Sequence, residues 1–171
     1  ENTLDSVAGL RRQPGLDVRL LSGPTAGSEG SLLPRCASLG VPVEAVPDLV
    51  RPVHPWRDVR ALSQLVSLFR TIQPHVVHTH SGKAGILGRC AAHRARVPIV
   101  VHTIHGPSFG PFQGALPNLL FRSAERWAGR RTTHFVAVCD AMIEQYVAAG
   151  IGPRSRYTRI WSGFDLAAFL A

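Results

Sequence analysis

The sequence predicts an α/β protein with a Rossmann-like, open and mostly parallel sheet that carries helices on both faces. Short runs rich in β-branched residues alternate with longer stretches in which apolar residues recur at helical spacing. This alternation favours a parallel sheet, because parallel neighbours must be joined by a crossover that is usually a helix. Several short runs are largely apolar, as expected for strands covered on both faces.

The predicted strands are short segments that follow one another at regular intervals. They are Asp17–Leu21, Val43–Val46, His75–His78, Ile99–Thr103, His134–Val138 and Tyr157–Trp161. The third, fourth and fifth of these are the apolar runs, so they are the expected centre of the sheet.

Helices are predicted between the strands. Apolar residues recur at helical spacing from Trp56 to Phe69. Ser81 suits the N-cap of a helix over Gly82–Arg96, and Pro98 prevents that helix from continuing. Two more helices are predicted over Leu116–Gly129 and Asp140–Ala149, and Gly150 suits the C′ position of the second.

The loops and the chain ends complete the predicted organisation. Gly23–Gly30, Val50–Pro55 and Gly106–Pro117 are expected to be long surface loops. The chain opens in a helical pattern over Thr3–Leu10, whereas a doubly wound domain begins with a strand and a glycine-rich turn. We therefore expect residues 1–171 to be a single domain that lacks its first strand and is truncated at both ends.

Composition narrows the class of protein. With 171 residues, 45% hydrophobic and 18% charged, the chain suits one globular domain, and no apolar run approaches the roughly 18 residues of a membrane span. Cys36, Cys90 and Cys139 are far apart and are expected to be free thiols in a reducing cytosol. The net charge of +8 comes almost wholly from scattered arginines, without the aromatic-rich basic stripe of a nucleic-acid-binding protein.

The first candidate site is the turn after the third predicted strand. His80, Ser81, Gly82 and Lys83 lie where ligands bind in open parallel sheets, and the free backbone N–H groups of this turn attract anions. The helix dipole disfavours a cation at this end by roughly 0.3–1 kcal/mol. An anionic ligand is one reason to keep Lys83 there, and a solvated lysine that points away is the alternative.

The next two strand ends carry the other candidates. His105 can donate a hydrogen bond to a sugar hydroxyl or a phosphate oxygen, and Gly106 is expected to allow a sharp turn. The alternative for His105 is a structural histidine. Asp140 lies where a strand passes into a helix, so it suits an N-cap or, as the other reading, a ligand contact.

No metal or cofactor is predicted. His78, His80, His102 and His105 lie on adjacent predicted strands, but no carboxylate accompanies them, and strand alternation sends His102 and His105 to opposite sides. The chain contains neither a D-x-D pair nor the G-x-G-x-x-G fingerprint of dinucleotide binding.

Three stretches together resemble the N-terminal domain of family 4 glycosyltransferases. The first is PHVVHTHSGKAGILGRCAAHRARVPIVVHTIHG, from Pro74 to Gly106, in which His-x-His precedes a Gly-Lys-Ala-Gly turn and a later strand ends in Thr-x-His-Gly. The others are FVAVCDAMIEQYVAAGI, from Phe135 to Ile151, and IWSGFDLAAF, from Ile160 to Phe169. Cys139 departs from the family, which usually has serine there.

The resemblance implies the acceptor-side, N-terminal half of a GT-B fold. It implies retaining, metal-independent transfer from a nucleotide sugar to a glycan or lipid-linked acceptor, in cell-envelope or exopolysaccharide biosynthesis. His105 would be the catalytic cleft histidine that contacts the donor sugar, and the His80–Lys83 turn would line the cleft. The donor-binding C-terminal domain with its E-x7-E carboxylates is not in this sequence, so the fragment is expected to be inactive alone.

Other readings stay open from the sequence. A GT-B-like nucleotide-sugar epimerase shares the architecture, and a non-enzymatic basic binding module would use the positive charge without catalysis. A cytoplasmic protein held at the inner face of an anionic membrane is also predicted, from arginine and aromatic residues on the helices that contain Trp56 and Trp127. The alternative is that both tryptophans face the core and leave ordinary solvated arginines.

Overall fold

The structure is a computed structural model that describes residues 2–24, 31, 33–80 and 82–163. Ser81 and most of the predicted Gly23–Gly30 loop lie outside the described residues. The chain divides into two compact units, one of Glu1–Val50 with Ser162–Ala171 and the other of Arg51–Trp161.

The first unit is a small α/β layer. Its elements are α1 (Asn2–Arg11), β1 (Leu20–Ser22), α2 (Leu33–Ser38) and β2 (Val43–Ala45). β1 and β2 pair in parallel, with Leu20 beside Val43. Leu4 and Val7 lie on one face of α1, and they share a small core with Cys36 of α2 and Val41. Helix α2 was not predicted from the sequence, because its 6 residues are too few to show apolar residues recurring at helical spacing.

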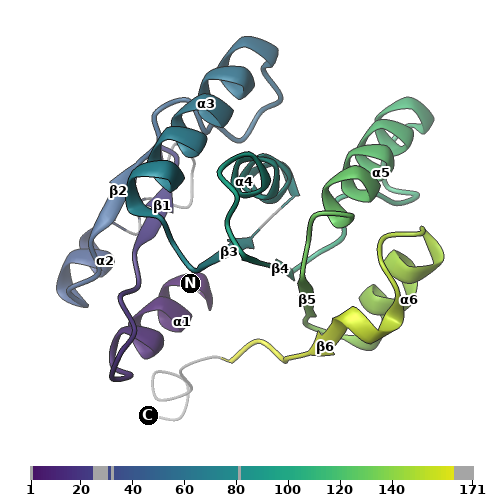
Figure 1. Ribbon diagram of the computed structural model, residues 1–171. Coiled ribbons are helices and arrows are strands. Elements are labelled where there is room, and N and C mark those ends of the chain that lie inside the picture. The colour runs from purple at the N-terminus through teal and green to yellow at the C-terminus, as the bar shows by residue number, and fades with distance from the viewer. Residues whose placement is uncertain (1, 25–30, 32, 81, 164–171) are drawn as a thin grey trace. The chain divides into compact units, whose positions relative to one another are not determined.

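The second unit holds a four-stranded parallel sheet in the order β3-β4-β5-β6. Its elements are α3 (Pro55–Ile72), β3 (Val76–His80), α4 (Gly82–Arg94), β4 (Ile99–Ile104), α5 (Ala115–Gly129), β5 (His134–Ala137), α6 (Asp140–Ala148), a 3₁₀ turn (Arg154–Arg156) and β6 (Tyr157–Arg159). Each strand adds to the same edge of the growing sheet. Right-handed crossovers therefore bring α4, α5 and α6 to one face, as Figure 1 shows.

The helix ends follow ordinary capping rules. Pro55 is the first residue of α3, the His54 ring accepts a hydrogen bond from the Arg57 N–H group, and Gln73 ends the helix in a left-handed conformation. Gly150, with φ of 73°, confirms its predicted place after α6. The predicted N-cap of α6 is wrong by one residue, because Cys139 has the extended cap conformation and Asp140 already lies in the first turn.

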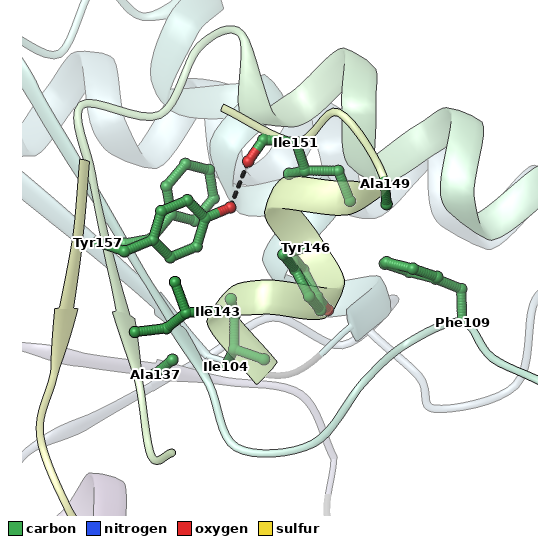
Figure 2. Close-up of a cluster of buried hydrophobic side chains, with 9 residues drawn as sticks. Ile104, Phe109, Ala137, Ile143, Tyr146, Ala149, Ile151 and Tyr157 are labelled. Carbon is green, nitrogen blue, oxygen red and sulfur yellow. Dashed lines mark hydrogen bonds between the residues drawn. The ribbon is translucent and has the colours of Figure 1, made fainter. Parts of the chain in front are cut away.

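The main core lies between the sheet and α6 (Figure 2). Phe135 of β5 stacks on Tyr157 of β6 with ring centroids 4.6 Å apart, and the Tyr157 hydroxyl donates to the Ile151 carbonyl. The same cluster contains Tyr146 of α6 and Phe109, which is only 5% exposed although it belongs to the loop after β4. That loop is therefore fixed to the core at Phe109 rather than lying loosely on the surface.

The Rossmann-like α/β class is confirmed, and all six predicted strands form, with ends that move by up to a few residues. Cys36 and Cys90 are buried free thiols, as predicted, whereas Cys139 is half-buried. The alternative in which both tryptophans face the core is wrong. Trp56 is 80% exposed, because α3 buries the stripe of Ala61, Leu65 and Phe69 instead, and Trp127 is 40% exposed.

Candidate active site

The predicted site residues that the structure describes lie at or near the carboxyl edge of the sheet in the Arg51–Trp161 unit. β3 and β4 are parallel neighbours, with His80 beside Thr103, and β4 and β5 pair Ile104 with Ala137. The strand ends that lead to His80, His105 and Asp140 consequently lie in a row at one edge. This is the edge at which ligands bind in open parallel sheets.

His80 and His105 contact each other directly. Nδ1 of His80 lies 3.0 Å from Nε2 of His105, and the two rings stack with centroids 5.3 Å apart. His78 lies on the same side of β3, and its Nε2 is 2.7 Å from the Thr103 hydroxyl. His80 and His105, which helix α4 separates in the sequence, therefore form a hydrogen-bonded pair in the structure.

These rings are neutral at physiological pH. Burial, followed by the neighbouring His78 and His105 rings, lowers the pKa of His80 to about 3. Burial also lowers the pKa of His105 below 6.5. In a neutral pair one ring donates and the other accepts, so the direction of the shared hydrogen bond decides what His105 can offer a ligand. If His105 donates through Nε2, its Nδ1 accepts; if it accepts, its Nδ1 donates.

A buried histidine supports this edge from below. His102 is 2% exposed, and its Nδ1 lies 2.9 Å from the Thr79 hydroxyl. A Cβ atom at Gly85 would lie 2.5 Å from Cε1 of His102, and one at Gly88 would lie 2.8 Å from Cγ2 of Thr79. Both positions on α4 therefore require glycine for close packing of helix against strand.

Lys83 has partners within the protein. Its ammonium group donates to the carboxylate of Asp58, in the first turn of α3, and to the Pro52 carbonyl. The Asp58 carboxylate also accepts from the His54 N–H group at 3.0 Å. The alternative given for Lys83, a solvated lysine that points away, is not what the structure shows, and a contact between Lys83 and an anionic ligand stays a prediction. No sequence pattern pointed to Asp58 as its partner.

Neither Gly106 nor Asp140 has the structural role predicted from the sequence, which was a glycine-dependent turn for Gly106 and an N-cap for Asp140. Gly106 lacks a positive φ, and a Cβ atom there would meet nothing within 4 Å, so the backbone does not need glycine at this position. The Asp140 carboxylate pairs with Arg159 at the end of β6 and lies 3.9 Å from Arg154. Gly82, in the first turn of α4, lies against Ser108, since its Cβ would be 3.0 Å from that of Ser108.

Sequence reasoning missed a buried polar group beside the site. Arg89 of α4 and Glu125 of α5 form an ion pair in which both side chains are fully buried. The signal was faint: Glu125 is an acidic residue on the core-facing side of a helix whose other charges are arginines.

Two further properties concern the described part of the chain only. Within it, no three His, Cys, Asp or Glu side chains are grouped so that they could bind a metal ion. None of its helices combines the length and the apolar character needed to cross a bilayer.

The fold defines the class as a Rossmann-like α/β domain, with a candidate ligand site at the carboxyl edge of its parallel sheet. A family described as "glycosyl transferase 4-like domain" matches residues 2–163. The chain belongs to this family.

Relatives of known activity agree with that assignment. Over 124 residues, the chain is 39% identical to an Escherichia coli UDP-Gal:α-D-GlcNAc-diphosphoundecaprenol α-1,3-galactosyltransferase, covering 72% of this chain and 32% of that protein. Among solved structures, Anabaena HepE in complex with UDP and glucose matches with a TM-score of 0.70 at 22% identity, over 96% of this chain and 41% of HepE.

The same fold also occurs in epimerases. A UDP-N-acetylglucosamine 2-epimerase matches with a TM-score of 0.69 at 18% identity, over 91% of this chain and 41% of the epimerase. This chain thus spans about a third to two fifths of the length of these proteins.

Proposed function

We propose that the protein to which this chain belongs transfers a glycosyl group from a UDP sugar, with retention and without a metal, to a lipid-linked acceptor. The observation that carries the proposal is the family match over residues 2–163. The matched residues include the hydrogen-bonded His80–His105 pair. The names of the relatives support the donor, because they mention UDP-Gal, UDP and a UDP-amino sugar. The diphosphoundecaprenol in the name of the E. coli relative supports the acceptor class.

In this proposal the chain supplies the acceptor-side half of the cleft. The bond from the anomeric carbon to the UDP oxygen breaks, and an acceptor hydroxyl oxygen bonds to the same face of that carbon. UDP leaves with the bonding electrons, and its departing oxygen takes the proton of the acceptor hydroxyl. A neutral His105 can hydrogen-bond the reacting sugar without adding a charge. The free N–H groups at the start of α4 suit a phosphate oxygen. Catalysis of this kind needs water excluded by closure of two domains, so residues 1–171 alone should be inactive.

The direct test is a transfer assay with the full-length protein. A panel of UDP sugars is incubated with a GlcNAc-diphospholipid, with and without EDTA, and the anomeric configuration of the product is read by NMR. We expect one α-linked product from an α-linked donor, at the same rate in EDTA. An inverted product, or a rate abolished by EDTA and restored by Mg²⁺, would contradict the corresponding part of the proposal.

An epimerase is the second candidate, because the epimerase structure matches almost as well as HepE. An epimerase would convert a UDP sugar to its 2-epimer without any acceptor, whereas a transferase would leave the donor sugar unchanged until an acceptor is added.

A control with duplex DNA and RNA at several salt concentrations tests the alternative of a basic binding module, whose affinity for nucleic acid would fall steeply with salt.

We also propose that this protein works in the cytoplasm and docks on an anionic membrane through the exposed stripe of α5. Leu116, Leu119 and Leu120 are each at least 60% exposed, and Trp127 and Arg130 continue the same face towards the C-terminal end of the helix. The guanidinium of Arg131 lies 3.8 Å from the centroid of the Trp127 ring. Apolar residues beside arginine and tryptophan suit the headgroup region of a bilayer.

Vesicle sedimentation of the full-length protein tests the docking surface. Binding should rise with the fraction of anionic lipid and fall with salt, since the screening length is about 10 Å at 0.1 M. Arg130→Gln/Arg131→Gln should weaken it more than the control Arg12→Gln/Arg19→Gln, which removes the same charge from the other unit. Equal loss in both pairs would show that only net charge matters.

A further inference from the structure

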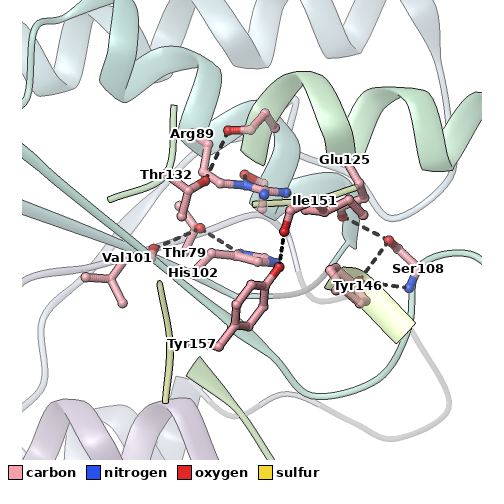
Figure 3. Close-up of polar contacts among 12 residues, drawn as sticks. Thr79, Arg89, Val101, His102, Ser108, Glu125, Thr132, Tyr146, Ile151 and Tyr157 are labelled. Carbon is pink, nitrogen blue, oxygen red and sulfur yellow. Dashed lines mark hydrogen bonds and ion pairs between the residues drawn. The ribbon is translucent and has the colours of Figure 1, made fainter. Parts of the chain in front are cut away.

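Figure 3 shows the ion pair between Arg89 and Glu125. The pair is unusual because both side chains are completely buried. A terminal nitrogen of Arg89 lies 2.6 Å from Oε2 of Glu125, and Nε of Arg89 donates to the Gly85 carbonyl at 2.9 Å. Replacing a buried ion pair by apolar residues of similar size is often neutral or even stabilising. Net stability is therefore a weak reason for two charges between α4 and α5.

The second carboxylate oxygen of Glu125 binds the loop that follows β4. The Ser108 hydroxyl donates to Oε1 of Glu125 at 2.9 Å. The hydroxyl of Tyr146, from α6, lies 3.2 Å from the Ser108 hydroxyl and accepts from the Ser108 N–H group at 3.4 Å. Ser108 is thus held by side chains from two helices, and it lies shortly after His105 in the chain.

Ser108 also packs against the start of α4, which follows the other strand end of the candidate site. Its Cβ would lie 3.0 Å from a Cβ atom at Gly82, in the turn that follows His80 and β3. Its carbonyl accepts from the Gln113 side chain at 3.0 Å, which closes the loop on itself. A shift of Ser108 would therefore move the loop that carries His105 and disturb its packing against the first turn of α4.

We propose that Arg89 and Glu125 are positioning residues that act through Ser108 to hold His105 at the strand end. The inference rests on the proposed function, in which His105 contacts the reacting sugar. The carboxylate suits the task because it accepts from the guanidinium and from the serine at once, whereas an amide would present its NH₂ group to one of these donors. A misplacement of about 1 Å at a reacting group can cost about 10²-fold in rate.

Two variants of the full-length protein separate positioning from stability. Ser108→Ala removes the hydrogen bond to the loop and leaves the ion pair intact. Arg89→Met/Glu125→Leu removes the pair but fills its volume, so the fold should be kept. The control is Asn118→Ala, which removes a different loop hydrogen bond, from the Gly110 N–H group, that does not involve the pair.

Both test variants should lower kcat by about 10²-fold, with the donor KM changed much less, because only the placement of the reacting group is altered. Hydrogen exchange of the amides from His105 to Gly110 should become faster, and Asn118→Ala should leave kcat within about threefold. A folded Met/Leu variant with the kcat of wild type would overturn the proposal. So would unchanged amide exchange in both variants. Absence of transfer by wild type would refute the proposed function, while the exchange comparison would still decide whether the pair holds the loop.

Discussion

Replacing Gly85 by alanine tests the close contact between α4 and β4. The added Cβ would lie 2.5 Å from Cε1 and 3.0 Å from Nδ1 of His102, closer than carbon atoms tolerate. His102 cannot easily move away, because it is 2% exposed and bound to the Thr79 hydroxyl. Something in the packed layer between helix and strand must therefore shift.

Three effects decide the size of the change. Overpacking of this kind costs about 1–3 kcal/mol. Displacing His102 also weakens its hydrogen bond to Thr79, a loss of about 0.5–1.5 kcal/mol. Against these costs, alanine is about 1 kcal/mol better than glycine inside a helix. We expect Gly85→Ala to lower the free energy of unfolding by about 0.5–3.5 kcal/mol, because the two packing costs together exceed the helix gain.

Gly9 provides a matched control. It lies in helix α1, and a Cβ atom there would meet nothing within 4 Å. Gly9→Ala should therefore raise the stability by about 0.5–1 kcal/mol. Urea and thermal unfolding measure both variants; about 1 kcal/mol corresponds to 2–4 °C in Tm for a chain of this size.

A second measurement assigns the cost of Gly85→Ala to His102. In a His102→Ala background the space is open, so the cost of adding the methyl group at position 85 should disappear and the helix gain should remain. If Gly85→Ala proved as stabilising as Gly9→Ala in the wild-type background, the inferred close approach of α4 and β4 would be refuted.

Three other predictions concern His105 and two buried groups. Under the proposed function, His105→Ala in the full-length protein should lower kcat by about 10²–10³-fold while leaving Tm nearly unchanged, by comparison with other transition-state hydrogen bonds; an unchanged kcat would remove His105 from the mechanism. Burial holds the pKa of His102 well below 6.5, so only the unfolded chain gains that proton as the pH falls through 6.5. The free energy of unfolding should then fall by up to about 1.4 kcal/mol per pH unit from this group, and urea titrations should show a shallower fall in His102→Gln. Glu125→Ala should cost about 3–5 kcal/mol in urea unfolding, because it leaves Arg89 charged and unpaired; a cost below about 1 kcal/mol would mean that water reaches the guanidinium.

The fold was predictable where a short stretch of sequence reflects burial or backbone conformation directly. Apolar runs such as Ile99–Thr103 identified the central strands, because a strand covered by helices has little room for polar residues. Gly150 identified the end of α6, because its left-handed conformation favours glycine. Helix α2 and the exact extent of β1 were not predictable, because segments this short depend on tertiary contacts for their stability.

The site was predictable in position but not in its contacts. Strand ends alone placed His80 and His105 at one edge, since parallel neighbours end together. Other features of the site are contacts between residues far apart in the chain. They are the His80–His105 hydrogen bond, the Lys83–Asp58 ion pair and the buried Arg89–Glu125 ion pair. Such contacts leave no periodic trace in a single sequence, and the geometry of neighbouring helices decides them.

The anchoring of Phe109 in the core limits how this protein can diversify. Because Phe109 packs on Tyr146 with ring centroids 4.9 Å apart, the segment from His105 to Phe109 has a fixed length between strand and core. An insertion there would displace either the histidine or the aromatic ring. The tip beyond it is different, since Phe112 is 64% exposed. Under the proposed function, new acceptor preferences should therefore evolve, or be engineered, by lengthening the chain near Pro111 and Phe112, where an added residue can project into solvent without disturbing the histidine pair.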